Sequence, residues 1–554
     1  MKTVLFPNRI LSILFVLLPV LLIGQNRFSW ENEFTKIVHY PIIDFIELNG
    51  SIYAVFKNNF GFSEITVNNS VVIRKIGMDL EIEKEEKQKL HHGKKPMGIQ
   101  KLFSYNNDLF ILGKVGTGKL KEQWFVVMEM DTSELTLGKK RFEFFTDKDI
   151  PQFFFPVQDG STETGKNDGF VFVSKFIERG DSIVSMDIFY LDEAFENEKK
   201  FNVSLDLKGQ EFDIKKVYFD GVDQIFLSGY ERPKIRKASL FRTSNKISNG
   251  HFWSINIKSG EVNHTVLQLD DFDQGEERKY IRDFDFMVKE GWVYIFGIYS
   301  ETEWKPMEYS QSGKGLFFQK ISQLDHKIQN FFYPIEDEVI KDHNETNEER
   351  KVRREIPDLE INDLKINEIV EFESNGFLIF TEVGYERVSS SGGRYTGPNS
   401  RSTPTSAYES HYSVSKDLIV FHLDKSGEQI WQSHIAKRDQ SEVNYFPPAG
   451  SYFYFMGENQ IQVFFMAPDF AFKNSEYSIA KIKPIKWNSY YNMVLCQASM
   501  NLQNGNTEYN IINTTSGTKT MILSPKVTKK ISSNRYIVLG RMRAKAKFGI
   551  IEIE

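Results

Sequence analysis

Residues Asn375–Gly384 read NGFLIFTEVG and residues Lys416–Lys437 read KDLIVFHLDKSGEQIWQSHIAK. Together they show a sequence pattern that recurs along the whole chain. A turn of Asn, Asp or Gly leads into a short strand of alternating apolar residues. A loop of variable length follows, and a second strand ends in another polar turn. This repetition predicts a series of short antiparallel sheets rather than one large sheet.

Eight stretches share the apolar strand that follows a tight turn. They read SIYAVFKNN from Ser51, DLFILGKVG from Asp108, GFVFVSKFI from Gly169, QIFLSGYER from Gln224, WVYIFGIYS from Trp292, GFLIFTEVG from Gly376, QIQVFFMAP from Gln460 and RYIVLGRMR from Arg535. Each is rich in β-branched and aromatic residues, which suit a pleated surface packed on both faces. The count predicts eight sheets, with seven as the alternative.

The two ends of the chain complement each other. Residues Phe28–Tyr40 (FSWENEFTKIVHY) resemble one isolated strand, whereas the last unit has strands near Lys529–Ser532, from Arg535 and in FGIIEIE, but no fourth. In a closed ring of four-stranded sheets, the N-terminal strand can supply the missing one. We therefore predict an all-β fold: a β-propeller of four-stranded antiparallel blades, closed by its N-terminal strand, as a single domain over residues 25–554.

The first 24 residues have the pattern of a secretory signal peptide. Lys2 and Arg9 precede an apolar run over Ile10–Ile23 that is too short to span a membrane comfortably. The alternative is an amphipathic or buried helix. The leader predicts export to the periplasm or the extracellular medium, with no integral membrane span after cleavage.

Composition agrees with a folded, exported chain. Hydrophobic residues make up 40% and aromatic residues 14%, with 48 Phe and 23 Tyr, which is ample material for a core. Cys496 is the only cysteine, so no intrachain disulfide can form, and its strand-like context YYNMVLCQ favours a buried thiol over a reactive one. The net charge of −6 argues against a general nucleic-acid binder.

Long insertions are expected to project from one face of the ring. In an up-and-down meander, first-to-second and third-to-fourth links share one face, and these links are mostly short, with the loop Asp159–Asp168 as the exception. The long segments fall on the other links: Glu83–Met97, Glu231–Gly250, Asp271–Tyr280, Glu301–Lys314, Glu336–Ile361, Glu386–Ser415 and Met500–Pro525. Elaborated loops on a rigid scaffold are where binding usually resides, although solvated decoration is the alternative.

Three of these segments supply the candidate binding residues. The basic loop after Glu231 contributes Arg232, Arg236 and Arg242, the loop after Glu301 contributes Trp304, and the polar loop at about 386–415 contributes or adjoins Tyr385, Arg387, Arg394, Tyr395, Tyr408 and Tyr412. Arginines could hold carboxylates, and aromatic rings could stack on sugar faces or peptide side chains. The charged insertion at about 336–361 differs from its surroundings, because it is dense in both charges, and it predicts a solvated helix or excursion.

Several apparent motifs do not predict a site. GKVGTGKL at Gly113–Leu120 has the spacing of a phosphate loop, but Leu120 replaces the hydroxyl and a strand follows where a helix is needed. The acidic run Asp270–Glu277 does not fit the calcium-loop spacing, and the pair His91 and His92 lies on a charged connector. No nucleophile-elbow or zincin motif occurs. We therefore expect no metal and no cofactor.

The segments DLIVFHLDKSGEQIWQSHIAK, SYFYFMGENQIQVFF and the terminal ISSNRYIVLGRMRAKAKFGIIEIE carry a resemblance. From about Asn375 onward the chain resembles uncharacterised exported β-propeller-like repeat proteins of Bacteroidota bacteria. The resemblance implies export and a repeat fold, and it implies no catalytic residues.

Two classes of function follow. The first is a non-catalytic binding or scaffolding module whose loop-rich face recognises a protein or polysaccharide at the cell envelope. The second is an enzyme that acts on extracellular glycans or peptides from the centre of the ring, since propellers host such chemistry without linear motifs.

Overall fold

The structure is a computed structural model. It describes residues 27–31, 35–36, 42–57, 70–105, 107–115, 123–146, 152–156, 170–177, 183–192, 198–207, 210–220, 222–232, 249–269, 279–301, 312–322, 328–340, 360–372, 376–391, 408–437, 439–442, 452–468, 471–473, 476–477, 485–486, 493–512, 515–516, 519–532, 534–542 and 545–553. The leader Met1–Gly24 lies outside these ranges. Among the described residues, no helix has the length and apolar character needed to cross a bilayer.

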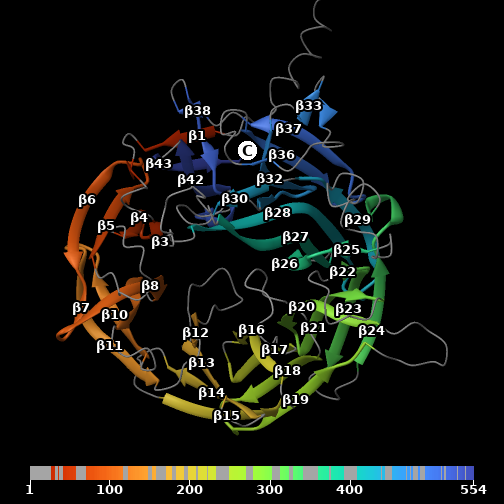
Figure 1. Cartoon of the computed structure of the whole chain (residues 1–554), viewed down its shortest axis with the longest axis horizontal. Helices are drawn as coiled ribbons and strands as arrows, with labels where there is room; N and C mark the ends of the chain where they lie inside the picture. The colour runs from red at the N-terminus through yellow and green to blue at the C-terminus, as the bar shows by residue number, and fades with distance from the viewer. Residues whose placement is uncertain are drawn as a thin grey trace, which may run out of the picture.

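The described residues form a ring of antiparallel sheets (Figure 1). Eight sheets have four or more strands: two have six, one has five and five have four. We number them sheet 1 to sheet 8 in chain order. In Figure 1 the first strand of a sheet lies nearest the centre of the ring, as β3, β8 and β20 do, and the fourth lies on the circumference. The prediction of an all-β propeller with antiparallel four-stranded sheets is confirmed.

Sheet 1 consists of β3 (Ile42–Leu48), β4 (Ser51–Lys57), β5 (Ser70–Gly77) and β6 (Ile82–Lys89), and sheet 2 consists of β8 (Lys95–Tyr105), β9 (Asp108–Val115), β10 (Gln123–Asp131) and β11 (Thr136–Thr146), with β7 (His91–His92) at its edge. Sheet 3 consists of β12 (Gln152–Pro156), β13 (Phe170–Ile177), β14 (Ile183–Leu191) and β15 (Glu198–Asp206). Sheet 4 consists of β16 (Glu211–Phe219), β17 (Gln224–Arg232), β18 (Asn249–Asn256) and β19 (Val262–Leu267).

Sheet 5 consists of β20 (Tyr280–Lys289), β21 (Trp292–Ser300), β23 (Gly315–Ser322) and β24 (Ile328–Pro334), and sheet 6 consists of β26 (Leu364–Phe372), β27 (Gly376–Ser391), β28 (Tyr408–Leu423) and β29 (Gln429–Ile435), with β30 (Asp439–Glu442) and β35 (Ile485–Lys486). Sheet 7 consists of β31 (Phe453–Met456), β32 (Gln460–Pro468), β36 (Met493–Asn501) and β37 (Thr507–Ile512). Sheet 8 consists of β40 (Ile522–Leu523), β41 (Lys529–Lys530), β42 (Arg535–Met542), β43 (Lys545–Glu552), β1 (Arg27–Trp30) and β2 (Thr35–Lys36). Smaller elements are β22 (Ser312–Gly313), β25 (Ile361–Asn362), β33 (Phe472–Lys473), β34 (Glu476–Tyr477), β38 (Thr515–Ser516), β39 (Lys519–Thr520), the 3₁₀ turn η4 (Pro525–Val527) and one helical turn over residues 337–340.

The eight apolar stretches marked by the sequence form β4, β9, β13, β17, β21, β27, β32 and β42, and each is the second strand of its own sheet. Their continuous apolar character has a physical reason, because both faces of an inner strand are covered by the two neighbouring sheets. In β4 the residues from Ser51 to Phe56 are all buried.

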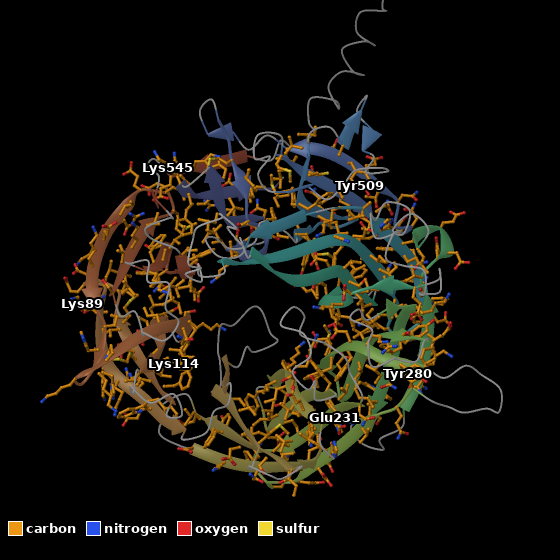
Figure 2. The ribbon with its side chains drawn as sticks, viewed as in Figure 1. Lys89, Lys114, Glu231, Tyr280, Tyr509 and Lys545 are labelled. Atoms are coloured by element: carbon orange, nitrogen blue, oxygen red, sulfur yellow. The ribbon has the colours of Figure 1, made fainter. Side chains whose placement is uncertain are left out.

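The core consists of eight apolar clusters rather than one mass. Each cluster joins two successive sheets, and the last of them joins sheet 8 to sheet 1 through Phe548 and Phe45, whose ring centroids are 5.2 Å apart. Figure 2 shows these side chains filling the spaces between neighbouring ribbons. Phenylalanine is well suited to these clusters, because its large ring bridges the roughly 10 Å between packed sheets.

The N-terminal strand completes sheet 8. β1 pairs antiparallel with β43, and Arg27 stands opposite Glu552. Trp30 lies over Gly540 and Gly549, where an added Cβ would come within 2.4 and 2.7 Å of its ring. The two glycines therefore make room for the indole, so the predicted pairing of the chain ends is confirmed for these residues.

Recurrent polar turns connect the third and fourth strands. In sheet 6 the Asp424 carboxylate accepts hydrogen bonds from the Glu428 amide (2.8 Å) and the Ser426 hydroxyl (2.7 Å), and Gly427 adopts a φ of 96°. Asn256 and Asn501 accept equivalent backbone hydrogen bonds in sheets 4 and 7. The side-chain oxygen replaces a backbone acceptor, which explains why an Asx residue is followed by glycine three or four positions later in these turns.

Strand order separates the links into two faces. We call the face with first-to-second and third-to-fourth links the short-link face, and the opposite face, with second-to-third links and links between sheets, the long-link face. β17, β21 and β27 end at the long-link face, at Arg232, Ser300 and Ser391. The predicted exception, Asp159–Asp168, lies outside the described residues.

Three predicted loops are wrong in part. Residues Glu83–Met97 are mostly β6, β7 and the start of β8; alternating lysines and glutamates mark the outer strand of a sheet here, not an insertion. Within Met500–Pro525, residues 502–506 form a turn on the short-link face and β37 follows. In the polar loop at about 386–415, both ends are strand, and residues 392–407 lie outside the described ranges.

Candidate functional site

Links from sheets 6 and 7 form a small sheet on the long-link face. β27 and β28 continue past the ring as a hairpin that reaches Ser391 and Tyr408. β30, from the link between sheets 6 and 7, pairs with β28, and β35, from the second-to-third link of sheet 7, pairs parallel with β30. We call this four-stranded extension the platform. Its strands join three links that are distant in the sequence.

A buried ionic cluster lies at the root of the platform. Lys437, which has no exposed surface, donates from Nζ to the Glu382 carboxylate and contacts the Ser415 hydroxyl. Ser415 donates to the same carboxylate, and Asn367 Nδ2 donates to Glu382 Oε2 at 2.5 Å. The cluster ties β26, β27 and β28 to the link that leads into β30.

The charges of this cluster are satisfied within the protein. Burial alone would raise the pKa of Glu382, but the Lys437 ammonium and the hydrogen bonds from Ser415 and Asn367 outweigh it and hold that pKa below its usual value. Tyr452 is buried beside them, and burial, followed by the charge of Glu382, raises its pKa. A serine beside a lysine can act as a nucleophile, but only where substrate reaches it. Here all three side chains are buried, so the cluster is structural.

The described ends of the long links of sheet 5 are fixed in a similar way. β22 and β25 pair, so the link after β21 is joined to the link that follows β24. Glu360, which is buried, accepts hydrogen bonds from the Ser300 hydroxyl (2.9 Å) and the Glu301 amide (3.0 Å). Arg282 donates to Ser300 at 3.2 Å. The charged insertion therefore returns to the ring at a buried carboxylate.

Sheet 4 has a third buried carboxylate at its long-link end, Glu231, which is labelled in Figure 2. Glu231 Oε1 lies 3.0 Å from His251 Nε2, and His251 Nδ1 lies 3.0 Å from His264 Nε2. Trp253 stacks on the His264 ring at 4.7 Å. Burial lowers the pKa of His251 to about 4. Both nitrogens of His251 are engaged in a linear chain, which is not the convergent geometry of a metal site.

The ten predicted binding residues have different positions relative to the described structure. Arg236, Arg242, Trp304, Arg394 and Tyr395 lie outside it, and Arg232, Tyr385, Arg387, Tyr408 and Tyr412 are placed through their backbones. The strand register brings Arg387 directly opposite Tyr412 and places Tyr408 opposite Ser391 in the platform hairpin. Arg232 stands opposite Glu211 in sheet 4. The strand pairing thus brings Arg387 and Tyr412 together in the platform, whereas Arg232 belongs to sheet 4.

The residues at the platform root were not predicted from sequence. Glu382 and Ser415 are 33 positions apart and Lys437 is 55 from Glu382, so no local motif joins them. The available signal is a charged residue inside an otherwise apolar strand, as in FLIFTEVG, because a buried charge needs a partner.

The inner wall of the ring carries a repeated ionic bridge. Asp44, directly after a β-bulge in β3, accepts hydrogen bonds from Lys529 Nζ of sheet 8 and from the Leu102 amide of sheet 2, both at 2.9 Å. Asp283, directly after a bulge in β20, accepts from Lys215 Nζ of sheet 4 at 2.7 Å and from the Ile366 amide of sheet 6 at 2.8 Å. Each aspartate thus connects three successive sheets.

A carboxyl on this wall, Glu368, has a raised pKa. Glu368, exposed on β26, accepts a hydrogen bond from the Tyr454 hydroxyl at 2.8 Å. The protein that surrounds the ring axis raises the pKa of Glu368 by desolvation, and the Tyr454 hydrogen bond and the Lys216 charge offset this only in part. Carboxyls with a raised pKa serve as proton donors in some enzymes.

Other sequence features have structural roles. Residues 123–131, after the phosphate-loop-like motif, form strand β10, as expected. His92 lies 3.0 Å from Glu143 and packs edge-on against Trp124. Cys496 is fully buried, as predicted, and burial raises the pKa of its thiol. Among the described residues, no three His, Cys, Asp or Glu side chains are placed to hold a metal ion.

No protein-family model matches the chain, and no curated protein matches its sequence. Among solved structures, the chain is similar to Sqt1 of Saccharomyces cerevisiae, with a TM-score of 0.39 and 7% identity over 95% of this chain and 99% of that one. It is similar to the WD40 domain of SCAP from fission yeast, with a TM-score of 0.37 and 7% identity over 95% and 98%. An α-L-arabinofuranosidase from Fusarium graminearum gives 0.29 and 9% over 56% of this chain and 98% of that one.

Proposed function

We propose that the protein is an exported, non-catalytic binding or scaffolding propeller whose long-link face recognises a protein or a polysaccharide at the cell envelope. The observation that supports this most is the platform, where three links from two sheets share one set of strand pairings. Strands that are paired and anchored at a buried ionic root lose little conformational entropy when they bind a ligand.

The polarity of the links fits recognition rather than decoration. Arg387 and Tyr412 occupy opposed positions in the hairpin that leads to residues 392–407. Arginine and tyrosine are the residues that most often dominate binding energy at interfaces. Arg232 ends β17 at the same face of the ring, so an extended ligand could contact both sheets.

The proposal is tested by shortening the platform. A variant in which residues 392–407 are replaced by a short Gly/Ser link should fold as the wild type does but lose binding to its ligand in a screen of envelope proteins and glycans. A matched variant with residues 157–169 shortened on the short-link face should retain it. Equal binding by both variants would contradict the proposal.

The second candidate is an enzymatic function that depends on Glu368. Its raised pKa and its Tyr454 partner suit general-acid catalysis on a glycan or peptide at the ring axis. A hydrolysis screen separates the two functions: turnover that Glu368→Gln abolishes supports the enzyme, whereas binding without turnover supports the recognition module.

A further inference from the structure

A polar pocket opens on the short-link face, opposite the platform. It has a volume of about 610 Å³ and is lined by sheet 7, from the turn at Gly457 to the turn at Asn504 and Asn506. Phe455, which lines it, also packs against the apolar cluster shared by sheets 7 and 8. The pocket therefore opens on the side of sheet 7 that faces sheet 8, and its volume falls within the range of small-molecule sites.

The strand register aligns one row of side chains across this pocket. Phe455 stands opposite Gln462, Gln462 opposite Ser499, and Ser499 opposite Glu508. Residues opposite each other in antiparallel strands share a face, and neighbouring strands lie about 4.8 Å apart. The row thus places an aromatic ring, an amide, a hydroxyl and a carboxylate in a line roughly 14 Å long.

Gln462 is the residue that indicates a ligand. Gln462 lines the pocket and is only 4% exposed, yet its buried Oε1 atom has no hydrogen-bond partner among the residues that the structure describes. Buried polar atoms in folded proteins are almost always hydrogen-bonded. A donor from outside the protein, such as a ligand hydroxyl, would satisfy this oxygen.

The other lining groups define the chemistry of that ligand. Asn501 and Asn504 also line the pocket, and their side-chain oxygens accept backbone hydrogen bonds within their turn, so any hydrogen bond from these two side chains to a ligand would be donated by the amide nitrogens. Gln460 and Asn506 add two further amides, and the lining contains no lysine or arginine. Amides both donate and accept, which matches hydroxyl groups, whereas the Glu508 carboxylate and the absence of lining cations disfavour anions.

We propose that this pocket binds a neutral carbohydrate. The amide groups and Ser499 would hydrogen-bond the sugar hydroxyls, and the Phe455 ring would pack against an apolar C–H face of the sugar. The site lies on the face opposite the platform and uses none of its residues, so it is independent of the proposed function.

The test measures the binding of neutral tetrasaccharides to the mature chain by calorimetry. We expect saturable binding of at least one of maltotetraose, cellotetraose, xylotetraose and mannotetraose, and about tenfold weaker binding of tetragalacturonate. Gln462→Leu should weaken binding about five- to tenfold without lowering the melting temperature, because it removes a hydrogen bond only to the ligand. Gln503→Ala, in the same turn but outside the lining, is the control and should bind as the wild type does.

Three results would overturn the inference. They are the failure of all four neutral sugars to saturate at millimolar concentration, wild-type affinity in Gln462→Leu, and a lowered melting temperature in that variant, which would mean that Gln462 bonds to the protein. If Gln462→Leu does not fold, Ser499→Ala provides the second variant with the same expected loss of affinity. Shortening residues 392–407 should leave this affinity unchanged, so failure here is distinct from failure of the proposed function.

Discussion

Replacing Lys437 by methionine should strongly destabilise the ring at the platform root. The side chains have similar volumes, so the change removes the ammonium without opening a cavity. The Glu382 carboxylate, 7% exposed, then keeps its hydrogen bonds from Ser415 and Asn367 but loses the ammonium that compensates its charge. Removing one partner of a buried ion pair costs about 3–5 kcal/mol, against about 0–1 kcal/mol for an exposed pair. We expect a loss of about 3–5 kcal/mol in the free energy of unfolding.

The double variant Glu382→Gln/Lys437→Met is the matched control. The neutral amide can accept from Asn367 Nδ2 through its oxygen and donate to the Ser415 hydroxyl through its nitrogen, so most of the lost stability should return. Guanidinium denaturation measures the free energies, and hydrogen exchange of β27 and β28 localises the effect. A single variant within about 1 kcal/mol of the wild type, or a double variant as unstable as the single one, would refute the buried ionic root.

Three further predictions concern other parts of the molecule. Deleting residues 25–36 removes β1 and β2 from the edge of β43, so the protein should aggregate or lose its cooperative melt, and an unchanged calorimetric transition would count against this pairing. His251 has a pKa of about 4 in the folded state and about 6.5 when unfolded, so its contribution to stability is present above pH 6.5 and is lost as the pH falls from 6.5 to 4; melting temperatures over this range should fall more steeply for the wild type than for His251→Gln. Cys496 should not react with a thiol reagent until denaturant is added, and rapid labelling of the native protein would show that the thiol is accessible.

The strands of the ring could be predicted from sequence because their signal is local. An apolar run such as Ile52–Phe56, directly after a polar turn, is covered on both faces wherever it occurs in the ring. The terminal strand was also predictable, since counting strands left sheet 8 without its fourth member. The outer strand β6, IEKEEKQK, was not, because its alternating charges resemble a solvated connector although one of its faces is partly buried.

The sites depend on register, which a single sequence does not contain. Lys437 meets Glu382 only after two hairpins fold, and the row from Phe455 to Glu508 exists only once four strands align. The inner bridges of Asp44 and Asp283 likewise need β-bulges to direct the carboxylates between sheets, and a bulge leaves no clear mark in composition.

We propose that the long-link face binds a ligand and that the ring does not catalyse a reaction. The most direct measurement is a parallel binding and hydrolysis screen of the mature protein against envelope proteins and glycans, repeated with residues 392–407 shortened. We expect a ligand that the wild type binds without turnover and that the shortened variant loses, while Gln462→Leu still binds it. Turnover that Glu368→Gln abolishes, or binding that survives the shortening, would contradict the claim.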